Sequence, residues 1–182
     1  YQAGIRTKGI HSKSEIESID VDRIKENLEE GKIVIVAGFQ GINENGDITT
    51  LGRGGSDTTA VALAASLGCN CIIYTDVEGI YPVDPKLYPN AKKIDCIGYK
   101  EMIEMSRLGA GVMETTSVEI GYRKNVPIYV TSSSKDTKGT YITGNESTIN
   151  CKPIIGIAID NNTSILTIKN ILLKSNDISI IF

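Results

Sequence analysis

The stretch Leu51–Leu67, LGRGGSDTTAVALAASL, decides the fold, because it passes from a glycine-rich turn into an alanine-rich segment. Ala60–Leu67 is rich in strong helix formers, and Gly68 supplies a helix stop. Cys71–Thr75, CIIYT, follows at once and predicts a buried strand. A helix that leads directly into a buried strand is typical of α/β proteins.

The flanking segments continue this alternation. Val21–Leu28 has apolar residues at helical spacing, and Lys32–Ala37 is a run of β-branched residues that predicts a strand buried on both faces. An Asn-Gly pair within Asn43–Asp47 predicts a hairpin. Tyr1–Ser18 is polar and mixed, so no element is predicted there. Two more helices and two more strands are expected downstream, at Tyr99–Arg107, Met113–Arg123, Pro127–Thr131 and Thr140–Ile142.

This order predicts an α/β fold, a three-layer sandwich with a mainly parallel central sheet. From Pro153 the pattern changes to short strand-like segments at 154–159, 165–168 and 178–181, with no helical pattern between them. Such a short stretch cannot close a core of its own. We therefore divide the chain into a first domain at 1–150 and part of a second domain at 151–182.

Composition places the protein in a broad class. The chain has 182 residues, of which 41% are hydrophobic and 23% charged, with a formal charge of −3, as expected of a globular protein. That charge is too mild for a nucleic-acid surface, and no apolar run is long enough to cross a membrane. The four cysteines lack zinc-site spacing, so no metal-binding residue is assigned. With no secretory leader, a reducing, cytoplasmic location is expected.

The turn Gly52–Asp57 carries the densest chemical signal. Glycines allow a ligand close to the backbone, the following helix start favours an anion, and Arg53 offers a planar fork for a carboxylate or phosphate. Asp57 is suited to a ligand ammonium. The alternative is a plain turn in which Ser56 or Asp57 caps the helix. The spacing fits neither the Walker A loop nor the dinucleotide fingerprint.

The segment Tyr74–Lys86 leaves the carboxyl end of a predicted strand, where open α/β sheets bind ligands. Its candidate groups are two hydrogen-bonding side chains, a flat ring, a second carboxylate and a cation for phosphate: Thr75, Asp76, Tyr81, Asp84 and Lys86. The alternative is a surface loop stiffened by prolines, with Asp84 and Pro85 starting a turn.

The two motifs occur in a specific order, Gly-Arg-Gly-Gly-Ser-Asp first and Thr-Asp-Val-x-Gly-Ile-Tyr-x-x-Asp-Pro second. In this order they resemble the aspartate kinases of the amino acid kinase family, and the resemblance covers about Gln2–Ile142. The surrounding segments Val36–Gly41 and Ile48–Leu51 are similar to the same family.

The resemblance implies transfer of the γ-phosphoryl group of ATP, with Mg²⁺, to the side chain of L-aspartate, the first step towards lysine, threonine and methionine. It implies that Arg53 binds the substrate α-carboxylate and Asp57 its ammonium. The implied lining residues are Gly54, Gly55 and Ser56, and the implied nucleotide residues are Thr75, Asp76, Tyr81, Asp84 and Lys86.

Parts of the family pattern differ here. The resemblance implies a catalytic lysine in a Lys-Phe/Tyr-Gly-Gly-Thr-Ser segment, expected upstream of Tyr1. Gly111 stands where many members have a phosphate-contacting lysine, and Met113–Thr116 replaces a stretch that usually contains His-Pro. Two alternatives therefore stay open: a non-catalytic nucleotide- or amino-acid-binding regulatory protein, and a kinase for another acid such as glutamate or acetylglutamate.

The C-terminal segment also has a resemblance. Lys152–Ile159 is similar to the entry of an ACT domain, a ferredoxin-like α+β module that binds a feedback amino acid such as lysine or threonine. The resemblance implies a homo-oligomer as well. An ACT unit needs a helix after its second strand, so we expect residues to be missing between Ile168 and Asp177.

Overall fold

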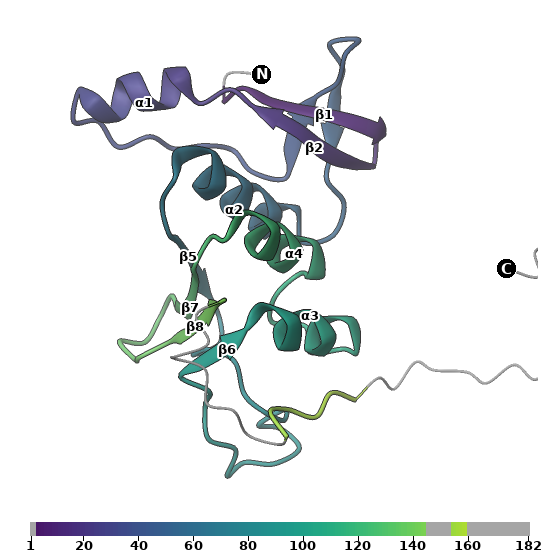
Figure 1. Cartoon of the computed structure of the whole chain (residues 1–182), viewed down its shortest axis with the longest axis vertical. Coiled ribbons are helices and arrows are strands. Elements are labelled where there is room, and N and C mark those ends of the chain that lie inside the picture. Colours follow the sequence, from purple (N-terminus) through teal and green to yellow (C-terminus); the bar gives the residue numbers. More distant parts are fainter. Residues whose placement is uncertain (1–2, 145–153, 160–182) are drawn as a thin grey trace, which may run out of the picture.

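A computed structural model describes residues 3–144 and 154–159. These residues form an α/β structure with two four-stranded sheets, and the α/β class is the one that the order of elements predicted. Figure 1 shows the first sheet at one end of the molecule, helices α2 and α4 across the middle, and the second sheet with α3 at the other end. No helix among these residues is long and apolar enough to cross a membrane.

The first sheet has the order β2-β1-β3-β4. Strands β1 (Ile5–Ile10) and β2 (Lys13–Ile19) form an antiparallel hairpin that the sequence analysis did not predict. Its interior is partly polar, because the Thr49 hydroxyl lies 2.6 Å from that of Thr7 and donates to the Ser14 hydroxyl at 2.9 Å. Buried hydroxyls hide the alternation of apolar and polar residues by which strands are predicted.

The predictions for the next segments have mixed outcomes. Helix α1 (Asp22–Glu29) is confirmed, and so is the hairpin, in which β3 (Gln40–Ile42) pairs with β4 (Ile48–Thr50). The predicted buried strand at Lys32–Ala37 is wrong. Ile33 and Ile35 are each 93% exposed, because β3 begins only at Gln40 and no strand of the described residues pairs with this run.

The second sheet holds the core. Its order is β5-β7-β8-β6, with β5 parallel to β7, β6 parallel to β8, and β7 antiparallel to β8. The strands are β5 (Cys71–Thr75), β6 (Cys96–Gly98), β7 (Ile128–Ser132) and β8 (Thr140–Thr143). Strand β5 is buried on one face only, since Ile72 and Tyr74 are exposed, which corrects the prediction of a fully buried strand.

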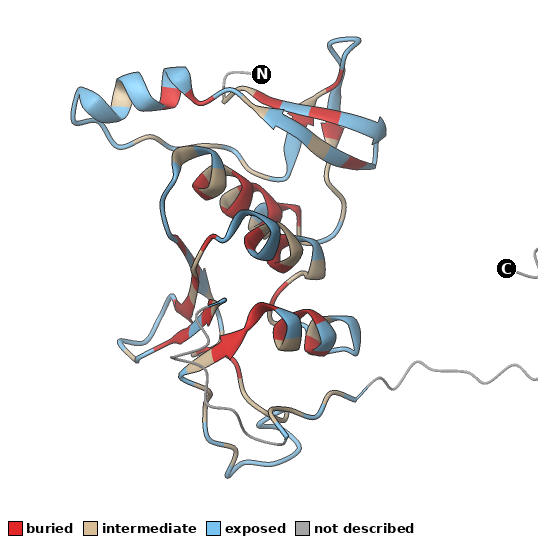
Figure 2. Cartoon of the chain, viewed as in Figure 1, coloured by how far each residue is buried: buried red, intermediate tan, exposed pale blue. Residues whose placement is uncertain are grey.

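Three helices pack around this sheet, and all three were predicted. They are α2 (Gly55–Leu67), α3 (Tyr99–Arg107) and α4 (Thr115–Lys124), the last beginning two residues later than expected. Figure 2 shows the buried residues gathered on α2, on α4 and in the second sheet, whereas α1 is mostly exposed. Fully buried side chains of this core are Val61, Ile97, Met102, Val118, Ile128, Val130 and Ile142.

The described part of the C-terminal segment is not a strand, so the prediction for 154–159 is wrong. Its backbone is linked to the rest by a hydrogen bond from Ile157 N–H to the Pro82 carbonyl at 2.6 Å, and Ile154 and Ile157 are exposed. The predicted strands at 165–168 and 178–181, the expected missing residues and the domain boundary after residue 150 lie outside the described residues.

Candidate functional site

The glycine-rich turn Gly52–Asp57 joins β4 to α2. Gly52 and Gly54 have φ of +77° and +67°, a left-handed backbone that glycine adopts without strain. Gly54 is the N-cap residue of α2 and no side chain caps the helix, so the alternative of a Ser56 or Asp57 cap is wrong. The Gly54 carbonyl accepts instead from the N–H and the hydroxyl of Thr58, at 3.1 and 3.2 Å.

Two side chains that the sequence analysis did not assign lie against these glycines. A Cβ on Gly54 would be 2.5 Å from Cγ and 3.0 Å from Oε2 of Glu114, and a Cβ on Gly55 would be 2.7 Å from Cδ2 of Phe39. Real Cβ atoms do not approach other atoms so closely. The two positions therefore exclude any larger residue unless Glu114 or Phe39 moves.

Phe39 itself has an unusual backbone. Its φ of +72° is uncommon for a residue other than glycine. Its N–H donates to the Thr59 hydroxyl at 3.0 Å, and its carbonyl accepts from the Leu51 N–H at 3.0 Å. Backbone outliers of this kind cluster at functional sites. The only signal for Phe39 in the sequence was its place in Val36–Gly41, a segment similar to the family.

The charges of the turn suit a zwitterionic ligand. Arg53 is exposed, and within residues 3–144 and 154–159 no hydrogen bond or ion pair involves its guanidinium. Asp57 is half-buried, and burial raises the pKa of its carboxyl, opposed by hydrogen bonds from the Glu114 backbone and the Ser56 hydroxyl. A guanidinium and a carboxylate four residues apart can bind the carboxylate and the ammonium, respectively, of a zwitterionic ligand.

The second candidate segment begins where β5 ends. Thr75 is the last residue of β5, and its hydroxyl donates to the carboxylate of Asp76 at 3.1 Å. Its carbonyl accepts from the Ser133 N–H at 2.8 Å, so the ladder between β5 and β7 continues one step past the strands. Thr75 and Asp76 thus lie at the carboxyl edge of two parallel strands, where α/β sheets bind ligands.

Farther along, Asp84 organises the loop from within. Its carboxylate accepts from the Lys86 N–H at 2.8 Å, and its carbonyl accepts from the Leu87 and Tyr88 N–H groups. This is the turn that the alternative interpretation predicted, and Lys86 is exposed on it. Tyr81 is half-buried, and its pKa is raised by burial first and then by the charge of Glu78.

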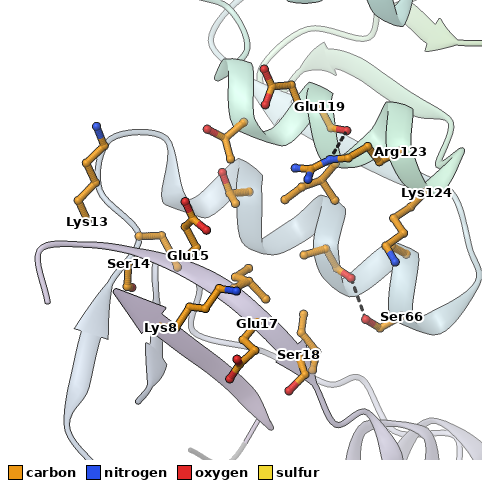
Figure 3. Close-up of a pocket in the computed structure, with 18 residues that line it drawn as sticks. Lys8, Lys13, Ser14, Glu15, Glu17, Ser18, Ser66, Glu119, Arg123 and Lys124 are labelled. Atoms are coloured by element: carbon orange, nitrogen blue, oxygen red, sulfur yellow. Dashed lines mark hydrogen bonds between the residues drawn. The ribbon is translucent and has the colours of Figure 1, made fainter. Parts of the chain in front are cut away.

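The structure does not join the two candidate segments directly. Among the described residues no hydrogen bond or ion pair connects the Gly52–Asp57 turn with the 75–86 loop. A cavity of about 870 Å³ lies elsewhere, between β2 and helices α2 and α4, and contains neither Arg53 nor any candidate nucleotide residue. Figure 3 shows its lysines and glutamates, including Lys8, Lys13 and Glu119.

Comparison with known proteins gives consistent results. The sequence profile of the Amino acid kinase family matches residues 1–132. The chain is 48% identical over 172 residues to an aspartate kinase of Pseudomonas putida, covering 93% of this chain and 42% of that protein. It is 46% identical over 183 residues to aspartokinase 2 of Bacillus subtilis, covering 100% of this chain and 45% of that protein.

A solved structure agrees as well. E. coli aspartokinase III in complex with aspartate and ADP superposes with a TM-score of 0.67 at 34% identity, covering 79% of this chain and 33% of that one. The fold and the glycine-rich turn before α2 thus define an α/β protein with a candidate site for a small zwitterion. The profile match places it more narrowly: this chain belongs to the amino acid kinase family. It spans less than half the length of the P. putida and B. subtilis proteins.

Proposed function

We propose that this chain is the amino-acid- and nucleotide-binding part of an ATP-dependent aspartate kinase. The observation that carries the proposal is the turn at Gly52–Asp57, with a free guanidinium on Arg53 and a half-buried carboxylate on Asp57, in a chain 46–48% identical to such kinases. The complex of E. coli aspartokinase III with aspartate and ADP supports the same pair of ligands.

In the proposed reaction, a side-chain carboxylate oxygen of L-aspartate attacks the γ-phosphorus of ATP. The bond from that phosphorus to the β,γ-bridging oxygen breaks, and 4-phospho-L-aspartate and ADP form. Arg53 binds the α-carboxylate, Asp57 the ammonium, and Gly54, Gly55 and Ser56 line the pocket. Catalysis of this kind consists of alignment and charge neutralisation, so cations near the phosphates matter most.

The nucleotide is assigned to Thr75, Asp76, Tyr81, Asp84 and Lys86, with Lys86 nearest the phosphates. Mg²⁺ arrives with ATP as part of the substrate. The described residues hold no group of three or more His, Cys, Asp or Glu side chains that could bind a metal. Mg²⁺ is commonly held by substrate phosphates, water and only one or two carboxylates.

Regulation and assembly are part of the proposal. Residues 151–182 are assigned to the start of an ACT-like module that would bind lysine or threonine, after a kinase domain at 1–150. A structure of E. coli aspartokinase III with lysine and aspartate supports such a ligand. We further propose a homo-oligomer in the cytoplasm, in lysine and threonine biosynthesis.

One observation favours a second candidate, a non-catalytic binding protein on the same scaffold. Gly111 is exposed, and a Cβ there would meet nothing within 4 Å, so the position has room for a side chain but does not supply the cation expected there. A protein of this kind would bind ATP or ADP and an amino acid without turnover.

The test is ADP release by the protein as its gene encodes it, with ATP, Mg²⁺ and a panel of L-aspartate, L-glutamate and N-acetylglutamate. The proposal predicts release that depends on aspartate and is lost in Arg53→Ala. Release with another acid alone would assign a different kinase of the family. Binding of ADP and aspartate without release would establish the non-catalytic alternative.

A further inference from the structure

Glu78 and Lys135 connect the two loops that leave neighbouring strands of the second sheet. Strands β5 and β7 are parallel and in register, with Thr75 opposite Ser132, so the loops emerge at the same edge. The Lys135 ammonium donates to Oε1 of Glu78 at 2.7 Å. The Lys93 ammonium adds a second link between the loops by donating to the Lys138 carbonyl.

Both members of the pair are tethered closely to ordered backbone. Glu78 is two residues from Ile80, which is 1% exposed and whose N–H donates to the Thr140 hydroxyl at 2.9 Å. Lys135 follows a turn in which the Ser132 hydroxyl accepts from the Ser134 and Lys135 N–H groups, at 3.2 and 3.3 Å. Because both connections are short, the ion pair favours one spacing between the loops.

The same carboxylate also interacts with a candidate nucleotide residue. The pKa of the Tyr81 hydroxyl is raised by burial and then by the charge of Glu78, so the Glu78 carboxylate acts on Lys135 of the other loop and on Tyr81 of its own loop. A tyrosine ring has only two side-chain torsions, so an electrostatic interaction at its hydroxyl favours one orientation of the whole ring. Lys135 places the Glu78 carboxylate and thereby influences the orientation of the Tyr81 ring.

We propose that Glu78 and Lys135 are positioning residues for the nucleotide, holding the Tyr81 ring and the two loops in the geometry that receives it. This inference rests on the proposed function, because it concerns the same nucleotide site. Neither residue is assigned to touch the nucleotide. Their contribution is to reduce the motion that the site must lose on binding.

The expected effect of the Glu78–Lys135 pair on nucleotide affinity is small, because both side chains are accessible to solvent. The Lys135 side chain is 64% exposed and that of Glu78 30%, so solvent and salt screen the pair. Exposed ion pairs of this kind contribute little free energy, so we expect loss of the pair to change nucleotide affinity by roughly two- to fivefold. The effect is expected to shrink as the salt concentration rises.

The experiment is calorimetric titration of the protein, as its gene encodes it, with ADP and separately with L-aspartate. Lys135→Met is compared with Lys138→Met, a matched control in the same loop whose ammonium pairs with Asp95 at 3.3 Å. Lys135→Arg tests rescue by a conserved charge. Tyr81→Phe, alone and combined with Lys135→Met, tests whether the two residues act through one another.

The inference predicts that Lys135→Met weakens ADP binding roughly two- to fivefold, that Lys138→Met does not, and that aspartate binding is unchanged in both. The losses of ADP affinity caused by Tyr81→Phe and by Lys135→Met should be less than additive in the double variant. Equal ADP affinities for Lys135→Met and Lys138→Met, or full additivity with Tyr81→Phe, would overturn the positioning role and leave the proposed function intact. Absence of ADP binding to the wild type would overturn both.

Discussion

The glycine-rich turn at Gly52–Asp57 and the loop from Thr75 to Lys86 are held in place by different means. In the turn, the side chains of Glu114 and Phe39 occupy the space where Gly54 and Gly55 would carry a Cβ. In the loop, the polar groups from Asp84 to Lys86 are exposed and bond mainly to their own backbone. Packing therefore constrains the sequence of the turn, whereas the exposed distal loop is held by its own local hydrogen bonds.

The largest expected effect is on the turn. Gly54→Ala combines a left-handed backbone with a collision against Glu114, so we expect the free energy of unfolding to fall by about 2–5 kcal/mol. Gly46→Ala is the control, because Gly46 has φ of +86° and open space around it, and should cost only about 1–2 kcal/mol. Urea denaturation measures both. Equal losses would mean that Glu114 yields easily and packing does not constrain the turn.

A smaller effect concerns the carboxyl of Asp57, whose pKa in the folded protein is raised by burial above its ordinary 3.8. The stability associated with its protonated form is present below the unfolded pKa and is lost as the pH rises through the folded pKa. Asp57→Asn should therefore gain stability relative to wild type as the pH rises above the ordinary carboxyl pKa of 3.8.

Denaturation at a series of pH values measures this difference. A loss of relative stability over the same range would mean that the hydrogen bonds from Ser56 and Glu114 outweigh burial. In that case the folded pKa of Asp57 would lie below its unfolded value, with the sign of the pH dependence reversed.

The smallest expected change in stability concerns the loop. Asp84→Ala removes the acceptor of the Lys86 N–H on the surface, so unfolding should become easier by only about 0.5–1.5 kcal/mol. Because the turn also places Lys86, ADP affinity should fall. Asp95→Ala, which removes another exposed carboxylate, is the control and should leave ADP affinity unchanged. A loss of stability as large as that of Gly54→Ala would refute the contrast between the two segments.

The sequence predicted elements well where local signals and packing agree. Gly68 ends α2 in a left-handed conformation, and α3 has the predicted bounds, because their helix signals are contiguous. The prediction of a buried strand at Lys32–Ala37 failed, because a run of β-branched residues indicates a tendency to form a strand but not which backbone will pair with it. The β1–β2 hairpin was missed because Thr7 and Ser14 bury hydroxyls where apolar residues are expected.

The candidate site shows the same limit. Residues within the two motifs could be assigned because they are contiguous in the sequence. Glu114 lies sixty residues from Gly54, and Lys135 lies fifty-seven residues from Glu78. Only the packing of α4 near the turn, and the pairing of β5 with β7, brings these residues to the site. No local signal in the sequence carries that information.

The most direct test of the account is calorimetric titration of wild type, Arg53→Ala and Lys86→Ala with L-aspartate and with ADP. The account predicts that Arg53→Ala weakens aspartate binding roughly ten- to a hundredfold, as expected for a lost charge-assisted contact, with ADP binding little changed. Lys86→Ala should show the opposite preference. Equal loss of both ligands in Arg53→Ala, or no loss of either, would contradict the assignment of the turn to the amino acid and of the loop to the nucleotide.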